Sequence, residues 1–194
     1  MAALIAFYSR AGENYFGGAH RRISMGNTEK AARMLAGITG GRFYRIEQAQ
    51  PYSADYDACT AQARADLQAN ARPAVLDLPD DLDAYDEIYL GYPNYWGTMP
   101  MAVYTFLEHY DLTGKTIHPF CTHKGSGLSR TEQDIRKAAP GTADEVANVA
   151  ELLMSDKGAF ISGATFLIDG GATASYYYGP LKPSAQPQNG APTL

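Results

Sequence analysis

The residues that could do chemistry in this 194-residue sequence lie in three polar loops. The first loop begins at Ser9-Arg10 and ends at Gly26-Asn27-Thr28, directly before a stretch of helical composition. A helix N-terminus presents backbone N–H groups and a favourable dipole to an anion. The side chains that would add hydrogen-bond donors or charge are Ser9, Arg10, Asn27 and Thr28. The loop therefore predicts a phosphate site, and capping of the helix by Asn27 or Thr28 is the alternative.

The second loop, Pro93-Asn94-Tyr95-Trp96-Gly97-Thr98, contains the only tryptophan of the chain. Aromatic side chains such as Tyr95 and Trp96 can stack on a broad planar ring. Gly97 would let the backbone approach the edge of such a ring closely. The pattern favours a site for a flat aromatic ligand, and an aromatic plug over the end of a sheet is the alternative.

The third loop, Thr122-His123-Lys124-Gly125-Ser126-Gly127, is rich in hydroxyl groups and glycine. Its backbone N–H groups could bind ring carbonyl oxygens. His123 would be a proton donor or a ligand contact, although a lone loop histidine is more often neither. A Rossmann fingerprint is excluded because Leu128-Ser129-Arg130 follows where a third glycine would be needed. A nucleotide-triphosphatase loop is excluded because no Gly-Lys-Ser/Thr run occurs.

Strand and helix patterns alternate through the first two thirds of the chain, which is typical of a parallel sheet with helices on both faces. The predicted strands are Ala2–Tyr8, Phe43–Ile46, Glu87–Gly91 and Thr116–Cys121. The predicted helices are Thr28–Ile38, Asp55–Asn70 with Asp55 as its cap, Met101–Tyr110 and a fourth from about Ser129 to before Pro140. Ligands of such folds bind beyond the carboxyl ends of the strands, so we expect the three loops to share one location.

Four stretches between about Ala3 and Pro140 resemble a bacterial flavodoxin-like family: AFYSRAGENY, GNTEKAA, GYPNYWGTMPMAVYTFLE and PFCTHKGSGLSR. The resemblance implies an α/β three-layer sandwich, a five-stranded parallel sheet in the order 2-1-3-4-5, and bound FMN. It also implies the FMN contacts: Ser9, Arg10, Gly26, Asn27 and Thr28 at the phosphate and ribityl chain; Pro93, Asn94, Tyr95, Trp96, Gly97 and Thr98 beside the ring; and Thr122, His123, Gly125, Ser126 and Gly127 on its pyrimidine side. The long insertion Glu13–Met25 in the first loop resembles a subgroup of the family.

From about Ala143 to Lys182 the chain is similar instead to the C-terminal end of short-chain dehydrogenases, in the stretch DEVANVAELLMSDKGAFISGATFLIDGG. Asp144–Ser155 has the apolar spacing of a helix, and Ala164–Ile168 has strand composition. We expect this helix to cover an apolar face and this strand to supply the fifth strand at the sheet edge. The chain would then form a single domain over residues 1–170, followed by an irregular tail over 171–194.

We expect no dehydrogenase site in this tail. Tyr178 and Lys182 have the Tyr-x-x-x-Lys spacing of that family's catalytic pair. The pair needs a helix to place both groups on one face, and Gly179-Pro180 between them makes a helix improbable. The glycine-rich turn that would bind the dehydrogenase cofactor is also missing.

The expected function is electron transfer through bound FMN, with the cofactor supplying the redox chemistry and no side chain acting as a catalytic group. Redox partner proteins or small electron acceptors would be its partners. The alternative is an FMN-dependent NAD(P)H:quinone-type oxidoreductase that uses the same loops. A third possibility is an interaction module that kept the fold and lost the cofactor.

Charge, cysteine content and hydrophobic runs bear on the remaining functional classes, the expected compartment and the oligomeric state. The net charge of −5 argues against nucleic-acid binding, which normally needs a basic face. The two cysteines, Cys59 and Cys121, have no metal or redox spacing and indicate reduced thiols in a cytoplasmic protein. We recognise no signal peptide and no membrane-spanning run. If the family's last helix is missing, the apolar face left uncovered would favour a homodimer.

Overall fold

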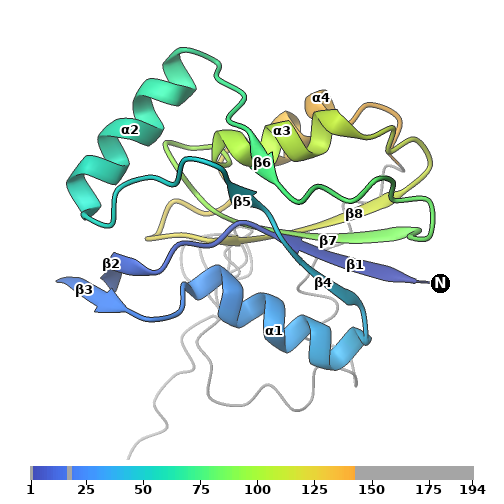
Figure 1. Ribbon diagram of the computed structural model, residues 1–194, viewed down its shortest axis with the longest axis horizontal. Helices are drawn as coiled ribbons and strands as arrows, with labels where there is room; N and C mark the ends of the chain where they lie inside the picture. Colours follow the sequence, from blue (N-terminus) through green and yellow to red (C-terminus); the bar gives the residue numbers. More distant parts are fainter. Residues whose placement is uncertain (1, 17–18, 143–194) are drawn as a thin grey trace, which may run out of the picture.

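The computed structural model describes residues 2–16 and 19–142. Its centre is a four-stranded sheet in the order β4-β1-β7-β8 (Figure 1). The strands are β1 (Ala3–Phe7), β4 (Arg42–Arg45), β7 (Glu87–Pro93) and β8 (Thr116–Thr122). All three pairings are parallel, so the predicted sheet type and the order of the first four strands are confirmed.

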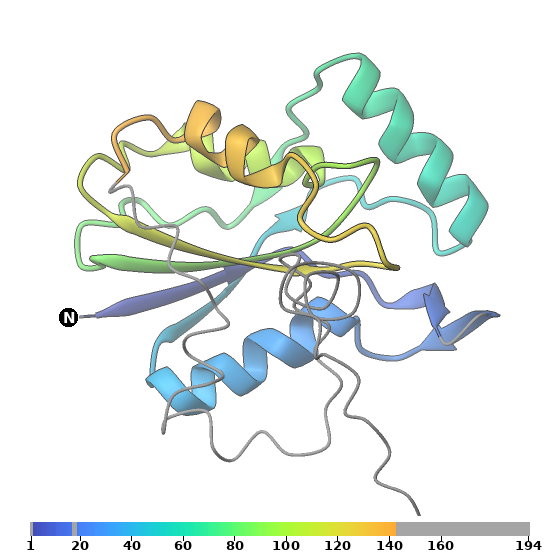
Figure 2. The ribbon, with the colours of Figure 1, turned by 180° about the vertical axis from the view of Figure 1, so that it is seen from behind.

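Helices cover both faces of the sheet, as predicted (Figures 1 and 2). One face carries α1 (Asn27–Thr39), and the other side carries α2 (Tyr56–Gln68), α3 (Met101–His109) and α4 (Thr131–Ala138). The helix boundaries agree with the predictions to within about two residues. Asp55 caps α2 as expected, because its carboxylate accepts the Ala58 N–H at 2.8 Å.

Alternate residues of the central strand β1 enter two separate cores. Leu4 and Ala6 belong to the larger core, which includes the apolar side chains of α3, such as Phe106. Ile5 and Phe7 pack with Ala31, Ala32 and Leu35 of α1 in the smaller one. A strand buried on both faces is apolar at every position, which is why the N-terminal run signals a central parallel strand.

The structure corrects one prediction, because the insertion between β1 and α1 is not a long loop. It contains an antiparallel hairpin of β2 (Gly12–Phe16) and β3 (Ala19–Ile23). A second short pair joins β5 (Glu47–Gln48) to β6 (Val75–Leu76). Neither pair has a buried face with alternating apolar residues, so the sequence pattern gives little sign of them.

The fifth strand predicted at Ala164–Ile168, the helix predicted at Asp144–Ser155 and the irregular tail over 171–194 lie outside the described residues. Within the described part of the chain, β8 pairs only with β7, and α1 is the only helix on its face of the sheet. The extent of the domain therefore stays a prediction. Among the described residues, we find no helix with the length and apolar composition needed to span a bilayer.

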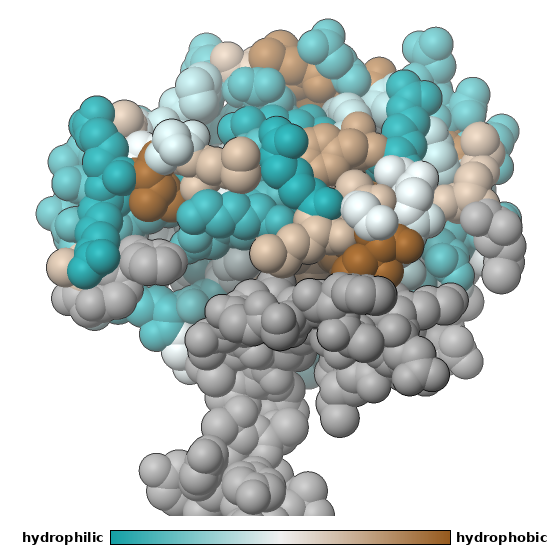
Figure 3. All heavy atoms as spheres, turned by 90° about the horizontal axis from the view of Figure 1, so that it is seen from below, coloured by the Kyte–Doolittle hydropathy of each residue, from teal (hydrophilic) through white to brown (hydrophobic). Residues whose placement is uncertain are grey.

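Seen from below, the visible part of the described surface is mainly hydrophilic, with hydrophobic residues in separate groups (Figure 3). The large hydrophobic side chains exposed in the described part of the chain are Met34, Phe43, Leu76 and Trp96. The Arg33 guanidinium lies 5.3 Å from the centroid of the Phe43 ring and partly covers it. Scattered hydrophobic side chains are normal on a monomer, and the predicted homodimer stays a prediction.

Gly91 of β7 allows the ring of Phe120, on the neighbouring strand β8, to lie directly against the β7 backbone. A Cβ atom at residue 91 would lie 2.2 Å from Phe120 Cζ. We expect Gly91→Ala to lower the free energy of unfolding by about 1–3 kcal/mol, because the buried ring must move. Urea denaturation would measure the change.

Gly37 provides the matched control, since a Cβ there meets no atom within 4 Å. Gly37→Ala, within α1, should stabilise the fold by about 0.5–1 kcal/mol through helix propensity. Unchanged stability of the Gly91→Ala variant would mean that Phe120 can shift without cost, contrary to this packing.

Candidate functional site

The three loops lie together at the carboxyl ends of β1, β7 and β8. The hydroxyl oxygens of Thr28 and Thr122 are 2.7 Å apart and join the first loop to the third. Asn94 joins the second loop to the third by donating from Nδ2 to the Gly127 carbonyl oxygen at 2.8 Å. The loops thus share one location, as the sequence predicts. Which of their groups contact a ligand stays a prediction.

The first loop packs tightly on the N-terminus of α1. Gly26 is the N-cap residue, and no side chain caps the helix through it. The Ser9 Oγ atom instead accepts the Glu29 N–H at 3.1 Å. Capping by Asn27 or Thr28, the alternative raised from the sequence, is therefore not what the structure contains. The first-turn N–H groups of Asn27 and Thr28 have no acceptor within the helix, which makes them available to an anion.

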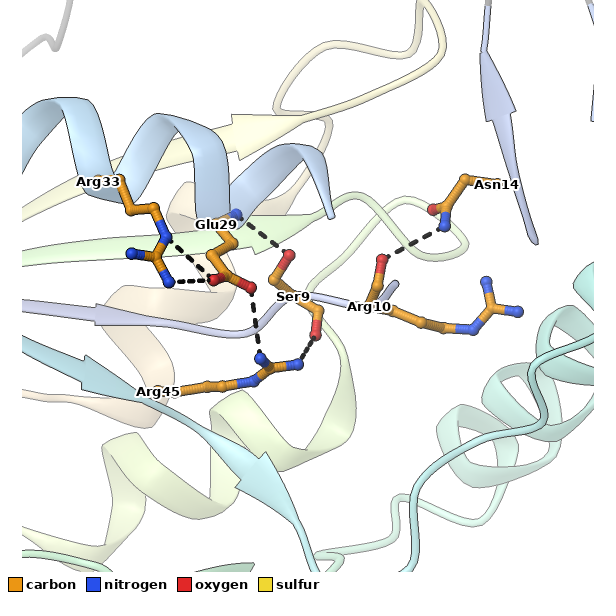
Figure 4. Close-up of polar contacts among 6 residues, drawn as sticks. All are labelled: Ser9, Arg10, Asn14, Glu29, Arg33 and Arg45. Carbon is orange, nitrogen blue, oxygen red and sulfur yellow. Dashed lines mark hydrogen bonds and ion pairs between the residues drawn. The ribbon is translucent and has the colours of Figure 1, made fainter. Parts of the chain in front are cut away.

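Arg10 does not supply charge to this helix N-terminus. Its side chain points away from α1 and toward the segment before α2 (Figure 4). The guanidinium donates to the carbonyl oxygens of Glu13, Ser53 and Ala54 at 2.6, 3.0 and 2.7 Å. In this structure Arg10 anchors the β2–β3 hairpin, because the hairpin and the segment before α2 surround it with backbone acceptors. Its predicted contact with the phosphate stays a prediction.

Sequence reasoning missed a charged network behind Ser9 (Figure 4). Glu29, whose side chain is 11% exposed, pairs with Arg33 at 2.7 Å and with Arg45 at 3.3 Å. Arg45 also donates to the Ser9 carbonyl oxygen at 3.2 Å. The four-residue spacing of Glu29 and Arg33 in a helix could have revealed the first pair. Only the pairing of β1 with β4, which aligns Phe7 with Arg45, reveals the second.

Asn94 shapes the second loop as well as holding it to the third. Its Oδ1 atom accepts the Gly97 N–H at 3.0 Å, and its backbone N–H donates to the Thr122 carbonyl oxygen at 2.9 Å. Tyr95 and Thr98 exchange two backbone hydrogen bonds across the turn. Residues 96 and 97 both have positive φ values, of 56° and 82°, and the second of these suits glycine. The loop is a tight turn that begins where β7 ends at Pro93.

Tyr95 turns into the protein and not toward the open side of the loops. Its hydroxyl group lies 3.9 Å from Cys59 Sγ. Its ring centroid is 6.4 Å from that of Tyr8 and 6.5 Å from that of Tyr52. Burial raises the pKa of the Tyr95 hydroxyl well above its ordinary value. This arrangement matches the alternative of an aromatic plug over the end of the sheet.

Trp96 lies against α2 but keeps 49% of its surface exposed. Its Nε1–H donates to the Thr60 carbonyl oxygen at 2.9 Å. The Arg64 guanidinium lies 4.9 Å from the centroid of the indole ring. These contacts hold the ring in place while leaving part of it accessible, so Trp96 stays a candidate for contact with a flat ligand.

His123 shapes the third loop, because its Nδ1 atom accepts the N–H groups of Gly125 and Gly127 at 3.0 and 3.1 Å. Beside it, Lys124 Nζ lies 3.5 Å from the centroid of the Tyr15 ring, which brings the hairpin to this loop. A Cβ atom at Gly125 would meet no atom within 4 Å, so the backbone there is open.

Both cysteines are free thiols, and burial raises their pKa values, that of Cys121 to about 12. We therefore expect iodoacetamide at pH 8 to leave the native protein unmodified and to alkylate both thiols in urea, as measured by mass spectrometry. The stability gained by burying the neutral thiols is complete below the ordinary thiol pKa of about 8.5 and is lost as the pH rises through their raised pKa values, that of Cys121 being about 12. Rapid alkylation of the native protein would contradict the burial of the two thiols.

No cluster of potential metal ligands occurs among the described residues.

The sequence matches the flavodoxin family over residues 19–155, which includes the Asp144–Ser155 stretch. Two similar solved structures are candidate flavoproteins. The one from Bacteroides uniformis is 30% identical, with a TM-score of 0.60, and the match covers 73% of this chain and 84% of that one. The one from Bacteroides eggerthii is 28% identical, also with a TM-score of 0.60, and the match covers 73% of this chain and 82% of that one.

A third similar structure is a flavoprotein from Lactobacillus acidophilus in complex with FMN. It is 20% identical, with a TM-score of 0.54, and the match covers 73% of this chain and 87% of that one. At this identity the likeness shows the fold alone. A search of curated proteins found no match.

Proposed function

The chain belongs to the flavodoxin family, and we propose that it is an FMN-binding flavoprotein that transfers electrons through the bound flavin. The observation that carries the proposal is the junction of the three loops, which is held by the Thr28–Thr122 hydroxyl contact at 2.7 Å and by the hydrogen bond from Asn94 Nδ2 to the Gly127 carbonyl oxygen at 2.8 Å. Membership of the flavodoxin family supports FMN as the cofactor, and the Lactobacillus acidophilus flavoprotein, which shares this fold, is in complex with FMN. On this proposal the protein exchanges electrons in the cytoplasm with redox proteins or small acceptors.

The residues at this junction fit FMN, which has an anionic phosphate at one end and a flat ring at the other. The first-turn N–H groups of Asn27 and Thr28 would hold the phosphate. The open backbone at Gly125 and the exposed part of Trp96 would border the ring. Bound FMN supplies the redox chemistry, while these residues bind and orient it.

An anaerobic reductive titration of the flavin-loaded protein, followed by absorbance, tests the proposal. We expect the protein to bind one equivalent of added FMN with quenching of flavin fluorescence. We also expect the bound flavin to take up electrons one at a time, as a carrier requires. A colourless protein with no affinity for added FMN would overturn the proposal and favour an interaction module.

An enzymatic function, NAD(P)H:quinone-type oxidoreduction, is the second candidate, and local charge favours it. The hairpin carries exposed Arg21 and Arg22 in β3, and Lys124 of the third loop contacts the same hairpin at Tyr15. This positive charge stands out on a chain of net charge −5 and would attract the phosphates of a pyridine nucleotide. Steady oxidation of NADPH with a quinone, without any added reductase, would support the enzyme over the carrier.

We also propose that the dehydrogenase-like stretch from about 143 to 182 completes the sheet, with Ala164–Ile168 as the fifth strand. The position of β8, which has one strand neighbour among the described residues, supports this. We expect deletion of 142–194 to cause aggregation or loss of FMN, because the outer edge of β8 would be unprotected. A soluble, fully FMN-loaded truncated protein would refute the proposal.

A further inference from the structure

A cavity of about 330 Å³ opens between the end of β1 and the segment that follows β4. It shares Ser9, Arg10, Ala11 and Gly12 with the first loop, and no residue of the second or third loop lines it. Its volume is at the lower end of the range for small-molecule sites and suits a single ring. The cavity therefore adjoins the phosphate loop of the candidate flavin site and lies apart from the two loops assigned to the ring.

Two arginines make this cavity electropositive. Arg10 donates only to backbone carbonyl oxygens, including that of Asp55 at 3.1 Å, and makes no ion pair among the described residues. Arg45 pairs with Glu29 through Nη1 and donates from Nη2 to the Ser9 carbonyl oxygen. The lining includes one carboxylate, that of Glu47, which belongs to an exposed residue. The balance of charge favours an anionic ligand.

One polar side chain in the wall lacks a partner. Gln48 is 7% exposed, and its Oε1 atom has no hydrogen-bond partner within the described part of the chain. A buried acceptor of this kind is unfavourable unless a donor reaches it. The aromatic residues Tyr8 and Tyr52 also line the cavity and provide surfaces against which a ring can pack.

We propose that this cavity binds a small planar aromatic anion, with one carboxylate and a hydroxyl group on the opposite side of the ring. The guanidinium group of Arg45 binds the carboxylate, Arg10 adds positive charge to the cavity wall while donating to backbone carbonyl oxygens, and the ligand hydroxyl donates to Gln48 Oε1. The ring packs against Tyr8 and Tyr52. Both tyrosines pack against Tyr95 of the second loop, so the ligand lies one layer of side chains from that loop.

Titration of 4-hydroxybenzoate into the full chain, with and without saturating FMN, tests this proposal by calorimetry. We expect a dissociation constant of about 1 mM or lower, which is ordinary for a ligand of this size. We expect similar affinity with and without FMN, so the result does not depend on the proposed flavin function. Phenol, which lacks the carboxylate, should bind at least about tenfold more weakly.

Two variants assign the contacts. Arg45→Gln and Gln48→Leu should each weaken binding of 4-hydroxybenzoate about tenfold or more. Gln50→Leu is the matched control, because Gln50 is exposed and does not line the cavity. Gln48→Leu should also raise the melting temperature by removing the unpartnered Oε1 atom. Weaker binding together with higher stability separates loss of a ligand contact from loss of the fold.

Three results would overturn the proposal. Absence of binding at millimolar probe would exclude the site. Equal affinity for phenol would exclude an anion as the ligand class. Release of FMN by 4-hydroxybenzoate would show that the cavity is part of the flavin site and not a compartment of its own.

Discussion

Gly26→Ala is expected to weaken FMN binding by about 100-fold or more. A Cβ atom at residue 26 would lie 2.2 Å from Ser9 Oγ and 2.6 Å from the Arg10 carbonyl oxygen. The hydroxyl group can rotate away, but the carbonyl belongs to the backbone, so the first loop must move off α1. The loss corresponds to about 2.7 kcal/mol, comparable to one or two charge-assisted hydrogen bonds to a phosphate.

Riboflavin, which lacks the phosphate, distinguishes this effect from general damage. Quenching of flavin fluorescence should show a large loss of FMN affinity in the Gly26→Ala variant and little change in riboflavin affinity. Gly37→Ala, in the same helix but with open space around it, is the control and should bind both as the wild type does. Equal losses for FMN and riboflavin would contradict the assignment of this loop to the phosphate.

The positions of the three loops could be predicted because they depend on the strands, whose patterns are local. β1 and β7 are mainly apolar, and β8 has buried apolar residues at Ile117 and Phe120. Parallel strands bring their carboxyl ends to one edge. The hairpin of β2 and β3 could not be predicted in the same way, since Arg21 and Arg22 of β3 are exposed and no apolar face marks it. The contacts between this hairpin and the segment before α2 join residues that are far apart in the sequence, so no local pattern reveals them.

The orientation of side chains within the loops was the least predictable feature of the site. Arg10 and Ser53 are 43 residues apart, and Trp96 and Thr60 are 36 apart. Residue type alone favours a guanidinium at a phosphate and an indole on a flat ring. Backbone acceptors from distant parts of the chain decide where these two side chains lie, and composition and spacing carry no information about them.

Asn94→Ala is expected to disturb the ring end of the proposed flavin site, opposite the phosphate end, and to lower the stability of the fold. The variant loses hydrogen bonds from Nδ2 to the Gly127 carbonyl oxygen and to Ser129 Oγ, at 2.8 and 3.1 Å. It also loses the bond between Oδ1 and the Gly97 N–H at 3.0 Å. At about 0.5–1.5 kcal/mol each, these bonds predict a loss of about 2 kcal/mol in the free energy of unfolding, measured in urea.

Since Asn94 holds the two loops on either side of the proposed ring position, its loss should weaken FMN and riboflavin about equally, by tenfold or more. This is the reverse of the pattern expected for Gly26→Ala, and one set of fluorescence titrations tests both. Asn94→Asp keeps an acceptor for the Gly97 N–H but loses the donor to Gly127, so its effect should be intermediate. If Asn94→Ala weakened FMN alone, Asn94 would act at the phosphate end, and the assignment of the two loops to the ring would be wrong.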